Sequence, residues 1–176
     1  GIGNLPGFKY EDYLYEGYGP NGVAIMMEVM TDNKNRTFPE IKHIMSKNGG
    51  NLGESGCVNW VFEKRGEILI EKILIDEELL LETILDLGIE DIDLDNPDYY
   101  CIITAPENFD NVSKELESKG MKIEGSISLL PSNTIQVSGS DISQLLKLLD
   151  ILEGHEDIQK VYSNFSIDDK DLNNID

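Results

Sequence analysis

The order in which apolar segments follow one another along the chain constrains its fold more than any other feature. An almost unbroken apolar run over residues 23–30 is typical of a central strand. A capping box begins at Thr37, and apolar residues recur behind it at helical spacing, which predicts a helix over residues 37–48. Residues 57–63 and 67–73 are predicted to be strands joined by a short turn. The first part of the chain therefore runs strand, helix, strand, strand.

The remainder repeats both kinds of element and closes with a helix and a strand. Leucine-rich helical spacing and alternating apolar residues predict two helices, at 76–87 and 106–119, and strands at 89–94, 99–104, 121–130 and 135–137. A further leucine-rich helix, capped by Ser140 and Asp141, ends at Gly154, and a strand follows at 158–165.

These patterns predict an α+β protein built from two ferredoxin-like α/β sandwich modules with mainly antiparallel sheets. The first strand-helix-strand-strand unit lacks the last helix and strand of such a sandwich, and the closing segment supplies them. We therefore expect a first domain formed by residues 1–73 and 133–168, an inserted α+β domain over 74–132, and a polar tail over 169–176. Two modules in series are the alternative arrangement.

Charge is distributed unevenly over the 176 residues. The 34 acidic and 14 basic residues give a formal charge of −20, so net charge repels phosphate backbones unless positive charge gathers locally. Positive charge does gather within residues 31–50, whereas residues 73–113 contain twelve acidic residues and no Lys or Arg. The predicted nucleic-acid-binding residues are Asn33, Lys34, Asn35, Arg36, Lys42, His43 and Lys47. A solvated helix face of mixed charge is the alternative explanation.

The sequence offers little for catalysis. His43 and His155 are its two histidines, and we expect both at the surface without metal-ligating neighbours. The glycine-rich run over residues 49–56 follows a helix and lacks the Lys and Ser/Thr of a phosphate-binding loop. We therefore predict no catalytic residue, metal or cofactor, and no enzymatic activity. Ligand binding or catalysis in a cleft between the two modules is the alternative.

The cysteines, the apolar runs and the first residues of the sequence indicate the cellular compartment of the protein. Cys57 and Cys101 lie in apolar runs and are predicted to be reduced, buried thiols. No apolar run approaches the roughly 18 residues of a membrane helix, and the first residues do not resemble a secretory signal. We therefore expect a cytoplasmic protein that does not contact a membrane.

Several ordered blocks resemble a known family. They are Tyr-Glu-Gly-Tyr-Gly-Pro-Asn-Gly-Val-Ala at 15–24, Thr-Asp-Asn-Lys-Asn-Arg-Thr at 31–37, Ser-Lys-Asn-Gly-Gly-Asn-Leu-Gly-Glu-Ser-Gly at 46–56, and Asp-Ile-Gln-Lys-Val-Tyr-Ser-Asn-Phe at 157–165. Together they resemble the YebC/PmpR family, which includes a mitochondrial translational activator. The resemblance covers nearly the whole chain.

The resemblance implies a cytoplasmic, DNA-binding transcriptional regulator. A ribosome-associated translational activator, which contacts ribosomal RNA and ribosomal proteins, is the alternative that it also implies. Family members begin with a basic helical domain, and this sequence starts at Gly1, where that domain would already have ended. We therefore expect a fragment holding the second and third domains, in a protein that contacts nucleic acid mainly through the preceding basic domain.

Overall fold

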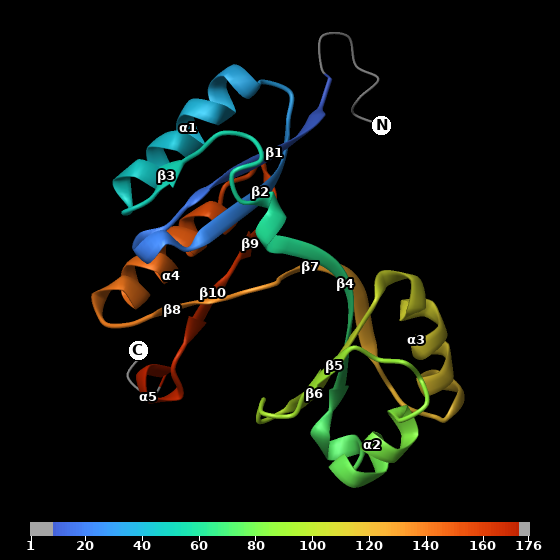
Figure 1. The fold of residues 1–176 in the computed structure, drawn as a ribbon. Coiled ribbons are helices and arrows are strands. Elements are labelled where there is room, and N and C mark those ends of the chain that lie inside the picture. Colours follow the sequence, from blue (N-terminus) through green and yellow to red (C-terminus); the bar gives the residue numbers. More distant parts are fainter. Residues whose placement is uncertain (1–8, 173–176) are drawn as a thin grey trace. The chain divides into compact units, whose positions relative to one another are not determined.

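The computed structural model describes residues 9–172 and separates the chain into two compact units (Figure 1). The first unit consists of Gly1–Phe62 together with Pro131–Asp176, and the second unit consists of Glu63–Leu130. Each unit contains one four-stranded sheet and two packed helices. The predicted α+β fold class with mainly antiparallel sheets is thereby confirmed.

In the first unit the four-stranded sheet has the order β3-β1-β2-β9, with antiparallel neighbours throughout. Its strands are β1 (Glu11–Tyr18), β2 (Ala24–Thr31), β3 (Asn51–Leu52) and β9 (Ile158–Ser163). The helices are α1 (Lys34–Lys47), α4 (Ser140–Glu153) and the short α5 (Asp169–Leu172). A separate parallel pair joins β8 (Ile135–Val137) to β10 (Phe165–Ile167).

Helices α1 and α4 pack together on one face of this sheet. Alternate residues of β2 point to that face, because side chains in a strand alternate between its two sides. Ile25, Met27 and Val29 accordingly join Ile41 and Met45 of α1 in the core, all of them almost fully buried. The leucines at positions 145, 148 and 152 of α4 complete the cluster. The burial of these apolar side chains fixes α1 against the sheet.

The second unit runs β-α-β-β-α-β along the chain. Its elements are β4 (Phe62–Glu71), α2 (Glu77–Ile84), β5 (Asp91–Asp93), β6 (Tyr99–Thr104), α3 (Phe109–Ser118) and β7 (Glu124–Pro131). The sheet order is β5-β6-β4-β7, which is the ferredoxin-like arrangement. Ile68, Ile70 and Ile102 pack against Leu80 of α2 and Leu116 of α3.

The boundary between the units differs from the predicted one. Residues 57–73 were expected to form a hairpin of the first domain, but Phe62–Glu71 form one continuous strand, β4, whose second half pairs with β6, from Gly66 opposite Thr104 to Glu71 opposite Tyr99. The Lys-Arg-Gly sequence at 64–66, predicted as a turn, lies inside this strand. Strand β4 therefore belongs to the second sheet.

The first unit also contains a strand that was not predicted. Strand β1 pairs with β2 over its whole length, so this unit begins strand, strand, helix rather than strand, helix, strand. Residues 169–172 of the expected polar tail form α5, and the rest of that tail lies outside the described residues.

Candidate nucleic-acid interface

The candidate surface begins where β2 passes into α1. The helix starts at Lys34, three residues before the predicted start, because the backbone carbonyl of Asn33 accepts the N–H groups of Arg36 and Thr37, both at 3.1 Å. Thr37 was expected to cap the helix, but it lies within it and is fully buried. The local sequence signal for a helix was correct, and its starting residue was wrong.

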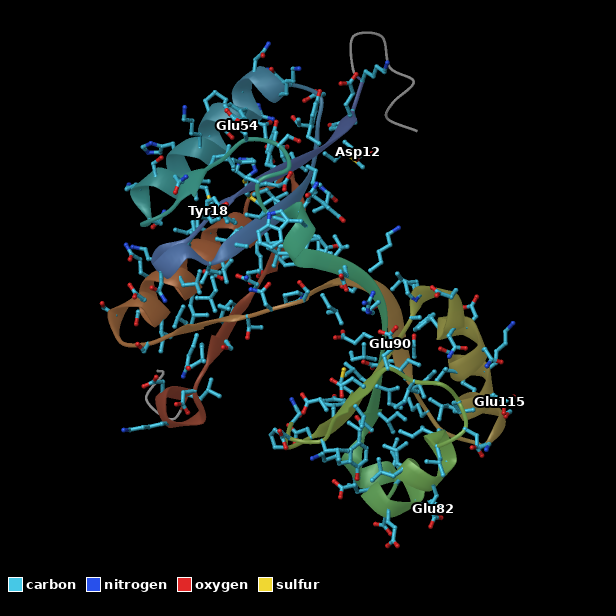
Figure 2. All side chains as sticks on the ribbon, in the orientation of Figure 1. Asp12, Tyr18, Glu54, Glu82, Glu90 and Glu115 are labelled. Atoms are coloured by element: carbon cyan, nitrogen blue, oxygen red, sulfur yellow. The ribbon has the colours of Figure 1, made fainter. Side chains whose placement is uncertain are left out.

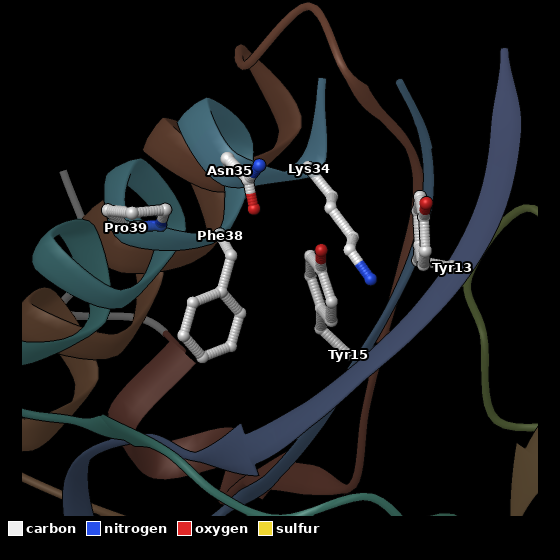
Figure 3. A pocket seen from close by; sticks show the side chains of 6 residues that line it. All are labelled: Tyr13, Tyr15, Lys34, Asn35, Phe38 and Pro39. Carbon is white, nitrogen blue, oxygen red and sulfur yellow. The ribbon is translucent and has the colours of Figure 1, made fainter. Parts of the chain in front are cut away.

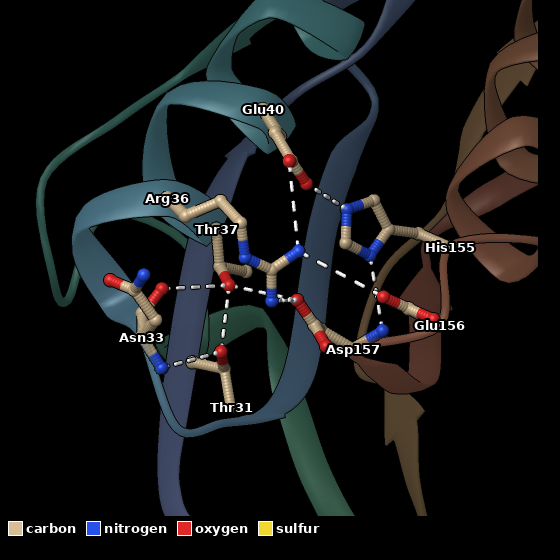
Figure 4. A network of polar contacts seen from close by, with 8 residues as sticks. All are labelled: Thr31, Asn33, Arg36, Thr37, Glu40, His155, Glu156 and Asp157. Atoms are coloured by element: carbon tan, nitrogen blue, oxygen red, sulfur yellow. Dashed lines mark hydrogen bonds and ion pairs between the residues drawn. The ribbon is translucent and has the colours of Figure 1, made fainter.

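The Thr37 hydroxyl belongs to a polar network that joins distant parts of the first unit (Figure 4). Its oxygen lies 2.8 Å from Asp157 Oδ2 and 2.8 Å from Thr31 Oγ1. Arg36 Nη2 donates to the same Asp157 oxygen at 2.9 Å, and Arg36 Nη1 lies 3.9 Å from Glu156. Because Asp157 is only 7% exposed, its carboxylate depends on these donors. Arg36, one of the predicted binding residues, therefore neutralises a buried charge.

His155 extends the network and departs from the surface position expected for it. Its Nε2 lies 2.8 Å from Glu40 Oε2, its Nδ1 accepts the backbone N–H of Asp157 at 3.1 Å, and its side chain is 11% exposed. Potential ligand atoms of Glu40, His155 and Asp157 lie within 4.8 Å of one another, as a metal site requires. Arg36 and Thr37 already donate to Asp157, however, so we interpret this cluster as a protein-internal network.

The other predicted residues, like Arg36, lie at the surface. Asn33, Lys34, Asn35, Lys42 and Lys47 are exposed, as is the last of the set, His43. His43 and Lys47 are one helical turn apart, and Lys42 projects about 100° around the helix from His43. Within residues 9–172, no ion pair is recorded for the three lysines. The structure therefore brings most of the predicted set together on α1, while it assigns Arg36 to a structural contact.

The glycine-rich loop after α1 has an internal ligand that the sequence did not reveal. The carboxylate of Glu16, only 2% exposed, accepts backbone N–H groups from Gly56 at 2.6 Å, Val58 at 3.1 Å and Asn59 at 2.6 Å. Converging amides of this kind form an anion-binding site. Because the protein's own carboxylate occupies them, these three amides are not available to a phosphate.

Both thiols are free and partly buried. Burial raises the pKa of Cys57, and the negative charge of Glu16 adds to this effect. Burial likewise raises the pKa of Cys101 to about 12, with Glu67 and Asp93 contributing. A raised thiol pKa opposes the thiolate form that nucleophilic catalysis requires. Neither cysteine has the electrostatic setting of a catalytic nucleophile.

The second unit differs sharply from α1 in charge. Residues 63–130 contain eighteen acidic and six basic residues, whereas α1 contains four basic residues and one acidic residue. Figure 2 shows Glu82 and Glu115 projecting from α2 and α3. Electrostatics therefore favours α1 over the second unit as a contact with a polyanion. None of the helices in residues 9–172 is long and apolar enough to cross a membrane.

The fold and its charge distribution define a class: an acidic α+β protein that presents a basic helix on one of its two units. Comparison with protein families is more specific. The family model for the second and third domains of the TACO1/YebC proteins matches residues 10–165. The chain belongs to this family, as the motifs in its sequence predicted.

Relatives and a solved structure agree with this assignment. A probable transcriptional regulatory protein from Dictyoglomus thermophilum is 50% identical over 177 residues, which cover 99% of this chain and 71% of the relative. One from Syntrophus aciditrophicus is 50% identical over 172 residues, covering 97% and 68%. The crystal structure of the conserved hypothetical protein Aq1575 from Aquifex aeolicus is 40% identical, with a TM-score of 0.80, over 95% of this chain and 69% of that one.

Proposed function

We propose that this chain is part of a cytoplasmic, non-enzymatic regulator of gene expression that contacts DNA through the exposed face of α1. The observation that carries the proposal is the set of lysines at positions 34, 42 and 47, which are exposed and have no carboxylate partner within residues 9–172. Lysines of this kind pair with phosphate oxygens. The names of the relatives, probable transcriptional regulatory proteins, support the same class of function.

The small number of lysines determines how strong the contact is. If three phosphates are neutralised, the logarithm of the binding constant falls with the logarithm of salt concentration with a slope of about −3 on duplex DNA. The surrounding charge of −20 further opposes binding. We therefore expect weak binding with a shallow salt dependence, and stronger attraction from a basic domain elsewhere in the whole protein.

Fluorescence anisotropy of a labelled DNA duplex at several salt concentrations tests the proposal. The double variant Lys42→Gln/Lys47→Gln is expected to weaken binding and to reduce the slope by about 2. Lys147→Gln is the matched control, because Lys147 is an exposed lysine on α4 of the same unit. An equal effect of the control and the double variant would contradict a contact at α1.

A ribosome-associated translational activator is the second candidate. It is favoured by the aromatic side chains of Tyr13, Tyr15 and Phe38 beside Lys34, because aromatic rings recognise unpaired bases, which RNA presents in its loops and bulges. Cosedimentation with ribosomes tests this candidate. The charge reversal Lys42→Glu/Lys47→Glu is expected to abolish cosedimentation, whereas unchanged cosedimentation of the variant counts against it.

A further inference from the structure

A groove lies between the beginning of α1 and the outer part of β1 (Figure 3). Its volume is about 380 Å3, and it is lined by Tyr13, Tyr15, Lys34, Asn35, Phe38 and Pro39. All six residues belong to the first unit. A volume of this size falls within the roughly 300–1,000 Å3 of small-ligand sites. The groove is therefore large enough to receive one planar group with its attached charge.

Three aromatic rings form its apolar part. The rings of Tyr13 and Tyr15 are stacked, with centroids 6.1 Å apart and planes inclined by 15°. Phe38 meets Tyr15 edge to face, with centroids 5.6 Å apart, and remains 40% exposed. Tyr15 also packs against the core, which holds its ring in place. The groove thus presents a fixed aromatic wall with an exposed ring at its edge.

Polar groups lie beside these rings. The Lys34 Nζ atom is 5.8 Å from the centroid of the Tyr13 ring. In the part of the chain that the structure describes, no hydrogen bond is recorded for the Tyr15 hydroxyl or for the Asn35 amide. Burial raises the pKa of Tyr15, so this hydroxyl stays protonated and able to donate. A ligand in the groove therefore meets a cation, an amide and a hydroxyl next to an aromatic surface.

We propose that this groove binds an unpaired nucleotide of RNA, with its base against Tyr15 and Phe38 and its phosphate at Lys34. The inference rests on the proposed contact between α1 and nucleic acid, and it specifies the ligand. A base inside a duplex exposes only its edges, whereas an unpaired base exposes the face that stacks on an aromatic ring. The Asn35 amide and the Tyr15 hydroxyl can bond to the ribose 2′-hydroxyl, which DNA lacks.

One carboxylate near the groove opposes a phosphate. Glu11 Oε2 accepts a hydrogen bond from the Tyr13 hydroxyl at 2.6 Å, and this bond is the main reason why the pKa of Tyr13 rises to about 12. Lys9 lies 4.0 Å from the other oxygen of Glu11 and partly offsets its charge. The phosphate therefore belongs on the Lys34 side, and Glu11→Gln is expected to strengthen binding of RNA.

Binding of three labelled nucleic acids to the whole chain tests the proposal: a short oligouridylate, the matching oligodeoxythymidylate and a DNA duplex. The variant Phe38→Leu keeps an apolar side chain but removes the ring, and it is expected to weaken oligouridylate binding at least about fivefold. Trp60→Leu is the matched control, because it removes a ring that is 69% exposed outside the groove. Far-UV circular dichroism verifies that both variants fold.

The expected result is tighter binding of oligouridylate than of oligodeoxythymidylate. The tight binding of oligouridylate is expected to be lost in Phe38→Leu and kept in Trp60→Leu. Equal affinities for the two single strands would overturn the assignment to RNA. Binding of all three nucleic acids without any effect of Phe38→Leu would overturn the groove and leave the contact through α1 standing. Failure to bind any nucleic acid would overturn both. Perturbation of Phe38 resonances by an acidic peptide, but not by oligouridylate, would assign the groove to a protein partner instead.

Discussion

The ion pair between Arg36 and Asp157 leads to a quantitative prediction about the stability of the first unit. The variant Arg36→Gln leaves the carboxylate of Asp157, only 7% exposed, without its cation. Breaking a fully buried pair costs about 3–5 kcal/mol, and breaking an exposed pair costs about 0–1 kcal/mol. Because the Arg36 side chain is 39% exposed, the solvent partly compensates for the loss of its charge. We expect a loss of about 2 kcal/mol in the free energy of unfolding.

A double-mutant cycle separates this ion pair from other effects of the substitutions. Asp157→Asn in the Arg36→Gln background removes the uncompensated charge, so the double variant is expected to lose at least about 1 kcal/mol less than the sum of the single variants. Urea denaturation followed by far-UV circular dichroism measures each stability. Hydrogen exchange in α1 peptides assigns the change to the first unit, because two units can unfold separately. Additivity within about 0.5 kcal/mol would refute the reasoning.

Four further predictions use the same structure. Lys42→Gln is expected to change the unfolding free energy by less than about 0.5 kcal/mol while it reduces the salt slope of DNA binding by about 1, and a large loss of stability would contradict its exposed position. Glu16→Gln weakens three bonds from backbone N–H groups and is expected to cost about 2 kcal/mol in urea denaturation; unchanged stability would show that the loop does not need the charge. Burial and a hydrogen bond to a carboxylate raise the pKa of Tyr162 from 10.0 to about 12, so the folded state holds its proton more tightly, and stability is lost as pH rises from about 10 to about 12. Tyr162→Phe is expected to flatten that decline, and an unchanged pH profile would contradict it. Cys101 is expected to react with iodoacetamide more slowly than a small free thiol at about pH 8, since its thiol is ionised in only a small fraction of the molecules. Equal rates would contradict its raised pKa.

The class of fold was accessible from the sequence, whereas the pairing of strands was not. Helical spacing located α1 and α4 along the chain, although α1 begins three residues earlier than predicted, because the signal for an amphipathic helix is local. The Lys-Arg-Gly sequence inside β4 resembled a turn, and local periodicity does not identify the partner of a strand, so it could not show that β4 pairs with β6. Strand β1 left a weak signal in the alternation of Tyr13, Tyr15 and Gly17, which the surrounding acidic residues and glycines obscured.

The candidate site was predictable only in part, for a similar reason. The lysines of α1 were recognisable from their local excess of charge, and the structure leaves them exposed. Arg36 carried the same signal, but its partner Asp157 lies 121 residues away in the sequence. Glu16 and the amides that it binds are likewise separated by about forty residues. Contacts over such distances become visible only once the chain is folded.

Ultraviolet crosslinking of the chain to oligouridylate and to duplex DNA, followed by mass spectrometry of the peptides, tests the central claim most directly. Because α1 holds the exposed lysines and one side of the aromatic groove, we predict crosslinks within residues 34–47 for both nucleic acids. Oligouridylate alone is predicted to add crosslinks at Tyr13 or Tyr15. Crosslinks confined to residues 63–130, or none above the level of an unrelated acidic protein, would contradict the account.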